Sequence, residues 1–304
     1  MRKKFTSVSA VVLCFLLIFS LCGCSSSGDE EETEFQAATI PVSDGIPVSE
    51  AEIIEFFNYM VSYVQQTDNF TSDNKPGVNT TESLSADNVK VLTLNTETGE
   101  TAEDESLDAL NSSVNAIRDR IISGIDTSVP VVAFGDMGSS ISEVIYPYDS
   151  AESTLMVSDV SSAQCYVDGS NMNITICLTD SADTVEKIFG TRDKASLIDE
   201  INSYSGEYAE ITDYSVSYIE DEENSVYSTI YLSVEVEQQD DGTYKSTGRI
   251  TALSYSIIAD VTANALCKGS FEDLGNIQIQ FRFTDTRSYE FDWLGSSTWE
   301  PTSE

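Results

Sequence analysis

The sequence predicts an α+β fold in which N-terminal amphipathic helices pack against a long, curved antiparallel β-sheet. Apolar residues recur at helical spacing from Ser49 and again from Thr101, and from Ala163 onward they alternate with polar residues at a period of two. Burying one large apolar side chain contributes roughly 1.5–3 kcal/mol, whereas ordering each backbone residue costs roughly 1–2 kcal/mol. Such a sheet is therefore stable only when its apolar face is covered, and the helices are the expected cover.

The chain is expected to divide into four parts. Residues 1–23 are predicted to be a lipoprotein signal peptide, 24–48 an acidic flexible linker, 49–295 a single α+β domain and 296–304 a C-terminal tail. The linker is rich in Ser, Glu, Thr and Pro. Because such a segment has little apolar surface to bury and charges of one sign, it cannot offset the entropy lost on ordering.

The N-terminus has the features of a secretory signal in the expected order. Basic residues at positions 2–4 precede an apolar run, residues 11–19, that is too short to cross a bilayer as a helix. The stretch LCGC, which ends at Cys24, resembles the lipobox of bacterial lipoproteins, although Cys22 stands where Ala or Ser is more usual. The resemblance implies cleavage before Cys24 and attachment of a diacylglycerol to its thiol. The protein would then be anchored on the outer face of the cell membrane; an ordinary signal peptide or an uncleaved anchor is the alternative.

Two segments have the apolar spacing of amphipathic helices. The first begins at a capping box formed by Ser49 and Glu52, and its apolar positions are Ile53, Phe57, Met60, Val61 and Val64. The second runs from Thr101 to Gly124, with acids at its start and arginines near its end, as the helix dipole favours. Its apolar positions are Leu107, Leu110, Val114, Ile117 and Ile121. Both patterns indicate helices with one face in a core.

The rest of the chain is typical of half-buried antiparallel strands joined by loops. A hairpin is predicted over residues 163–178, with its turn at 168–171, and short helices are expected near 185–189 and 197–201. Residues 128–150 are interpreted as an irregular connector because they contain several Pro and Gly residues. Further strands are expected at 89–94, 214–218, 226–237, 253–261, 277–283 and 289–293.

The composition excludes several classes of partner. The chain carries 52 acidic and 15 basic residues, a formal net charge of −37 at pH 7, and therefore repels nucleic acid and anionic lipid headgroups. No acidic stretch has the alternating ligand order of a calcium loop, and we expect neither a metal nor a cofactor. The hairpin turn would place Cys165 and Cys177 out of opposition, so we expect small buried hydrophobes instead of a disulfide. An exported chain without disulfides is typical of a Gram-positive surface.

The sequence also lacks the signatures of common catalytic sites. It contains no histidine, which removes the commonest general base and triad partner. It has no G-x-S-x-G motif and no phosphate-binding glycine loop. A pair of neighbouring carboxylates carries no information in a chain with 52 acids. We therefore expect a non-catalytic protein.

Several stretches resemble a known group in order and spacing. They are SEAEIIEFFNYMVSYVQQ, STLMVSDVSSAQCYVDGSNMNITICLTD, GRITALSYSIIADVTA and IQIQFRFTDTRSYEFDW, which together span most of residues 49–293. They are similar to a group of uncharacterised lipoproteins from gut Firmicutes. The resemblance implies a tubular lipid-binding fold, as in the bactericidal/permeability-increasing proteins. In that fold a long, curved sheet wraps a helix and an apolar groove between them can hold a lipid.

Two hypotheses for function follow. In the first, a lipid or another apolar ligand lies between helix and sheet, where each buried CH₂ group contributes about 0.8 kcal/mol. The residues expected to line that groove are Phe57, Met60, Leu110, Val114, Ile230, Leu232, Ile279 and Phe281. These side chains could equally contact one another and leave no room. In the alternative, the protein is a cell-envelope module that binds a protein or polymer without a ligand cavity, through surface tyrosines such as Tyr227 and Tyr231 or through strand edges.

Overall fold

A computed structural model describes most of the predicted domain. The described residues are 46–65, 76–107, 112, 127–133, 154–189, 194–205, 209–221 and 226–293. The predicted signal peptide, Cys24, the linker up to residue 45 and the C-terminal tail lie outside these residues. No helix within the described ranges is long and apolar enough to cross a membrane.

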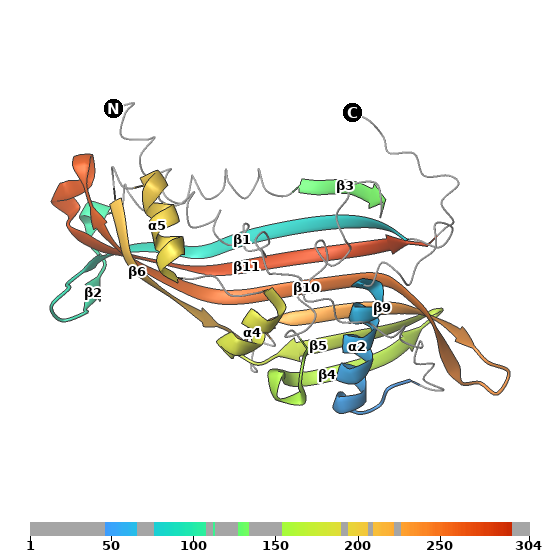
Figure 1. The fold of residues 1–304 in the computed structure, drawn as a ribbon. Coiled ribbons are helices and arrows are strands. Elements are labelled where there is room, and N and C mark those ends of the chain that lie inside the picture. The colour runs from blue at the N-terminus through green and yellow to red at the C-terminus, as the bar shows by residue number, and fades with distance from the viewer. Residues whose placement is uncertain are drawn as a thin grey trace, which may run out of the picture.

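Within the described residues, nine strands form one antiparallel sheet, and two short strands form a separate pair (Figure 1). The order along the sheet is β2-β1-β11-β10-β9-β5-β4, with β3 added beside β1 and β6 beside β10. The strands of the large sheet are β1 (Gly77–Leu94), β2 (Thr101–Ala102), β3 (Thr127–Ala133), β4 (Val160–Asp168), β5 (Asn171–Leu178), β6 (Ala209–Tyr218), β9 (Thr229–Gln238), β10 (Tyr244–Cys267) and β11 (Asn276–Asp292). The pair consists of β7 (Glu220–Asp221) and β8 (Val226–Tyr227).

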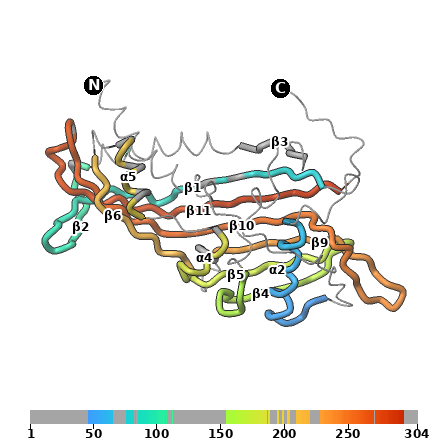
Figure 2. Tube along the Cα trace, viewed as in Figure 1, coloured from blue at the N-terminus to red at the C-terminus, as the bar shows by residue number. Residues whose placement is uncertain are grey.

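Strand β10 lies at the centre of this sheet and pairs with three other strands. One of its edges pairs with β11 over residues 252–266, and its other edge pairs first with β9 and then with β6. Figure 2 shows β1, β11 and β10 running side by side along the length of the sheet. The sheet therefore has two halves in line, one completed by β9, β5 and β4 and the other by β6.

Helices and short 3₁₀ turns accompany the sheet. They are α2 (Glu50–Gln65), α4 (Ala182–Phe189), α5 (Lys194–Ser205), η2 (Glu105–Leu107), η4 (Val157–Asp159) and η5 (Gly269–Leu274). The predicted capping box starts α2: the backbone N–H of Ser49 donates to Glu52 Oε2 at 2.9 Å, and the N–H of Glu52 donates to Ser49 Oγ at 3.3 Å. The backbone N–H groups of Ser49 and Val48, which both donate to the Glu52 carboxylate, lower the pKa of Glu52. The cap fixes where the helix begins.

Alternation gives the sheet two unlike faces. We call the face that carries the buried apolar side chains the inner face and the opposite one the outer face. In the half of the sheet with β9, β5 and β4, inner-face residues such as Ile176 and Leu232 form one core with Phe57 of α2 and Ile188 of α4. In the half with β6, a second core gathers β1, β6, β10 and β11 residues together with Leu107. Both cores lie on the same face of β10 and β11.

The coarse prediction of a sheet-rich antiparallel fold is confirmed, and three local predictions are wrong. Thr101 and Ala102, expected to begin a helix, pair with the end of β1 as a strand, and the next regular element is the 3₁₀ turn η2. Residues 128–133, part of the stretch expected to be irregular, belong to β3, which pairs with the edge of β1. Strand β1 begins at Gly77 rather than near residue 89, because its polar first half is held by pairing with β11.

The predicted hairpin is confirmed. Strands β4 and β5 pair with Asp168 opposite Asn171, and Gly169 of the turn has a φ of 62°, a left-handed value that glycine adopts without strain. The short helices expected near 185–189 and 197–201 are α4 and α5, each longer than predicted.

Candidate functional site

The predicted groove residues fall into two separate cores. Phe57, Met60, Ile230 and Leu232 lie together in the core under α2, and all are at least 97% buried. Ile279 and Phe281 are buried in the other core, toward β6. Leu110 and Val114 lie outside the described residues. The structure therefore brings four of the eight residues together and places two elsewhere.

A buried ion pair lies on β11 between the two cores. Asp285 and Arg287 take the inner-face positions between Phe283 of one core and Tyr289 of the other. Arg287 Nε is 3.4 Å from Asp285 Oδ2, and their side chains are only 9% and 6% exposed. The cross-strand neighbours of this pair on β10 are Tyr255 and Ile257. Sequence reasoning missed this feature, although two charged residues in register with Ile277 to Phe291 were a signal for it.

Burial also governs the aromatic residues beside this pair. Tyr255 and Tyr289 meet edge to face, with ring centroids 6.4 Å apart and planes at 79°. Loss of water around the hydroxyl, followed by the neighbouring Tyr289, raises the pKa of Tyr255 well above its usual value. Tyr255 therefore stays neutral and serves as part of the core.

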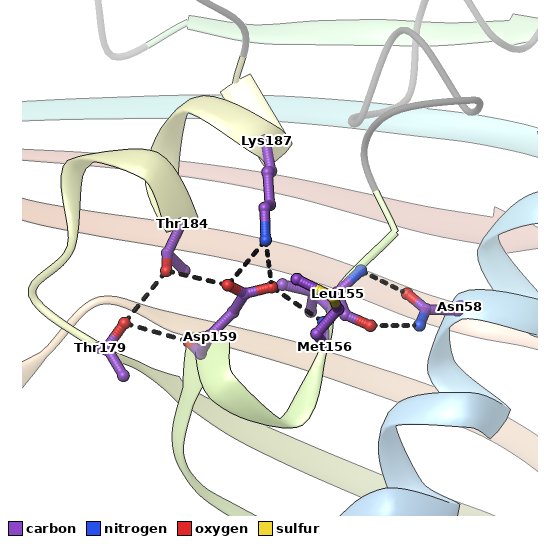
Figure 3. A network of polar contacts seen from close by, with 7 residues as sticks. All are labelled: Asn58, Leu155, Met156, Asp159, Thr179, Thr184 and Lys187. Atoms are coloured by element: carbon purple, nitrogen blue, oxygen red, sulfur yellow. Dashed lines mark hydrogen bonds and ion pairs between the residues drawn. The ribbon is translucent and has the colours of Figure 1, made fainter.

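A polar network fastens the helices over the inner face (Figure 3). Lys187 Nζ on α4 donates to both carboxylate oxygens of Asp159, at 2.8 and 2.7 Å, and the N–H of Met156 donates to Asp159 Oδ2 at 2.9 Å. The Thr184 hydroxyl donates to Asp159 Oδ1 at 3.5 Å. Three donors thus make four hydrogen bonds to a carboxylate that is almost fully buried, so Asp159 holds these elements together.

The same network reaches α2 through a side-chain amide. Asn58 donates from Nδ2 to the carbonyl oxygen of Leu155 at 2.8 Å and accepts from the N–H of Leu155 at 3.1 Å. The Asn58 amide thereby satisfies both the N–H and the C=O of Leu155, as a neighbouring strand would do. The two connections tie α2 and α4 to the same short segment, residues 155–159.

The outer face presents two straight rows of uncharged residues across six strands. The register places the residues of each row directly opposite one another from β1 to β4, through β11, β10, β9 and β5. One row is Thr81, Ser288, Ser254, Tyr231, Thr175 and Gln164; the other is Ser83, Thr286, Ser256, Thr229, Cys177 and Ser162. We call these twelve positions the neutral zone. None of them is charged, although 52 of the 304 residues are acidic.

Charged residues lie further along the strands, beyond the neutral zone on both sides. On one side Arg282 Nε is 3.0 Å from Asp260 Oδ1, between β11 and β10. On the other side Arg249 lies 3.6 Å from Glu235, which also accepts a 2.9 Å hydrogen bond from the Thr247 hydroxyl. Inside the zone the hydroxyls bond to one another, as Ser256 and Thr286 do at 3.0 Å. The zone is a patch of donors and acceptors without net charge.

Two tyrosines mark the β4 end of the outer face. Tyr231 donates its hydroxyl to Asn173 Oδ1 on the neighbouring strand at 2.7 Å. Tyr166 on β4, opposite Asn173, is 54% exposed. The predicted outer placement of Tyr231 is thus what the structure shows, whereas the side chain of Tyr227 lies outside the described residues. Tyr166 was not predicted, although it alternates with Cys165 and Val167 of the inner face.

The three cysteines within the described residues, Cys165, Cys177 and Cys267, are free thiols. Cys165 is opposite Ile174 and Cys177 is opposite Ser162, so the two lie on opposite faces of the hairpin and no disulfide joins them, as expected. Burial raises the pKa of both Cys165 and Cys267 to about 11. These two thiols are poor nucleophiles at neutral pH.

In the part of the chain that the structure describes, no group of three His, Cys, Asp or Glu side chains is placed to hold a metal ion. Comparisons of the chain with protein-family models, with curated proteins and with solved structures found no match. The outer face, with its neutral zone and two tyrosines, is the candidate functional site.

Proposed function

We propose that this protein is a lipid-anchored, non-catalytic protein of the outer face of the cell membrane that binds a component of the cell envelope through the outer face of its sheet. The observation that carries the proposal is the neutral zone. A chain with a net charge of −37 keeps twelve adjacent solvent-side positions free of charge. Solubility alone does not require such a patch, since charged residues at these positions would serve it better.

The anchor rests on the N-terminal sequence. A diacylglycerol on Cys24 supplies two acyl chains, which are enough for stable membrane attachment. Metabolic labelling with a fatty acid tests this: the wild-type protein takes up label and Cys24→Ala does not. Label on Cys24→Ala would end this part of the proposal.

Binding to isolated envelope fragments tests the outer face. Ser254→Glu places an acid in the centre of the neutral zone and is expected to abolish retention of the protein on envelope fragments in a sedimentation assay. Thr262→Glu is the matched control, because it adds the same charge to the solvent side of the same strand outside the zone. Equal retention of the wild-type and Ser254→Glu proteins would contradict the proposal.

A second candidate function is the binding of a lipid or other apolar ligand between α2 and a curved sheet. It is favoured by the meeting of Phe57 and Met60 with Ile230 and Leu232 in one core between helix and sheet. Organic extraction of the purified protein followed by mass spectrometry tests it. A stoichiometric lipid in the extract supports a carrier, and repeated purification without bound lipid counts against one.

A further inference from the structure

We infer that the outer face of β4, β5 and β9 binds an uncharged polysaccharide of the cell envelope, with Tyr166 and Tyr231 as its two aromatic contacts. The inference rests on the proposed function and assigns the partner a chemical class. Three features carry it: the fixed position of the Tyr231 ring, the exposure of Tyr166, and the neutral amides and hydroxyls between them.

Tyr231 is held across the neighbouring strand. Its hydroxyl donates a hydrogen bond to Asn173. The direct cross-strand partner of Tyr231 is Thr175, and Asn173 lies two residues before Thr175 on β5. The side chain must therefore lean over β5 instead of standing away from the sheet. Asn173 is only 7% exposed although it lies on the outer face, which is consistent with the ring lying over it. The aromatic ring is thus oriented before any ligand binds.

Tyr166 supplies the second ring. It lies on β4, the last strand in the sheet order, two strands from Tyr231 and one row along. Two inter-strand spacings and two residue rises place their Cα atoms roughly 12 Å apart. Because Tyr231 leans over Asn173, which is directly opposite Tyr166, the two rings converge on the same strip of β5.

The groups around the two rings are amides and hydroxyls. Gln164 and Thr175 face each other in the row beside Tyr166 and Asn173. Side chains of these types both donate and accept hydrogen bonds, as sugar hydroxyls do. The rings offer flat apolar faces with a polar tip, which match the C–H faces of sugar rings. A polysaccharide presents both kinds of surface in every residue.

Charge limits the partner to an uncharged one. An anionic polymer approaching this face meets the field of a chain with a net charge of −37 and finds no cation among the twelve positions of the neutral zone. A docking protein usually needs a contiguous apolar centre. Here the polar residues Asn173, Thr175 and Gln164 lie around the two rings, so the patch lacks such a centre.

The probe is polysaccharide prepared from the cell envelope. Protease removes its protein, and anion exchange separates it into a neutral and an acidic fraction. Affinity electrophoresis of the full chain through gels containing each fraction measures binding. The neutral fraction is expected to retard the wild-type protein, and Tyr166→Ala and Tyr231→Ala should each weaken its affinity about tenfold, which corresponds to about 1.4 kcal/mol. Tyr231→Phe, which keeps the ring and removes its anchor, should lose less. Leu266→Ala, at an exposed position at the far end of β10, is the control and should bind normally.

The outcomes separate the inference from the proposed function. Retardation by the neutral fraction that is weakened in both tyrosine variants supports both the inference and the proposed function. Two outcomes overturn the polysaccharide inference and leave the proposed function in place. In one, the protein is retained on intact envelope but not after protease treatment; in the other, it binds the acidic fraction. No retention on intact envelope overturns both. Circular dichroism of each variant shows whether it is folded, and a folded tyrosine variant with wild-type affinity also overturns the inference.

Discussion

Each face of the sheet carries an Asp–Arg ion pair, which is buried on the inner face and partly exposed on the outer face. Asp285 and Arg287 lie on the inner face with side chains 6% and 9% exposed, whereas Asp260 and Arg282 lie on the outer face with side chains 52% and 40% exposed. Both arginines belong to β11 and are five residues apart. The comparison separates what a charge does for folding from what it does for recognition. A buried charge depends on its partner, whereas an exposed one is hydrated and mainly shapes the field that a ligand meets.

Loss of the inner pair should show the largest of the stability effects that this comparison predicts. Arg287→Met is expected to lower the free energy of unfolding by about 3–5 kcal/mol, because the buried carboxylate of Asp285 loses the cation beside it. Urea unfolding followed by circular dichroism measures the change. A loss below about 1 kcal/mol would mean that the pair is hydrated and would remove the contrast between the faces.

A pair of neighbouring residues on β5 extends the comparison to uncharged side chains. Ile176→Ala, at a fully buried inner-face position, should cost about 2–5 kcal/mol through lost burial and the resulting cavity. Thr175→Ala, one residue away on the outer face, should stay within about 0.5 kcal/mol. Both are measured by the same urea unfolding. Similar costs for the two would show that the outer face is covered as well.

The inner face could be predicted from the sequence because it follows from alternation. The apolar positions from Ile230 to Val236 and from Ile277 to Phe283 are buried where the period of two places them. The capping box of α2 and the β4–β5 hairpin were equally local signals. Each depends on residues close together in the chain.

The features that were missed depend on distant partners. The polar first half of β1 has weak strand character of its own and is a strand because β11, some 200 residues later, pairs with it. Pro130 made residues 127–133 look irregular, and an edge strand tolerates proline. The neutral zone could not be predicted at all, because it exists only once the register of six strands is fixed.

The reactivity of the three described cysteines tests which face of the sheet each one occupies. Because burial raises the pKa of Cys165 and Cys267 to about 11, only about one thiol in a thousand is a thiolate at pH 8. In the folded protein iodoacetamide should therefore label Cys177, on the outer face, well before either of them. Labelling of Cys165 should rise about tenfold per pH unit up to about pH 11. Peptide mass spectrometry measures each site, and labelling of Cys165 as fast as Cys177 at pH 8 would contradict the assignment of faces.

Loss of the outer ion pair should cost far less stability than loss of the inner one. Arg282→Gln removes a partly exposed cation whose pairing with Asp260 contributes at most about 1 kcal/mol to the free energy of unfolding. At 1 M salt, where the Debye length is about 3 Å, even this difference from the wild-type protein should shrink toward zero. Urea unfolding at low and high salt measures it, with Arg287→Met as the comparison, because a buried pair is screened much less. A large, salt-independent cost for Arg282→Gln would place both ion pairs in the same environment and remove the physical distinction between a face that holds the fold together and one that is available to a partner.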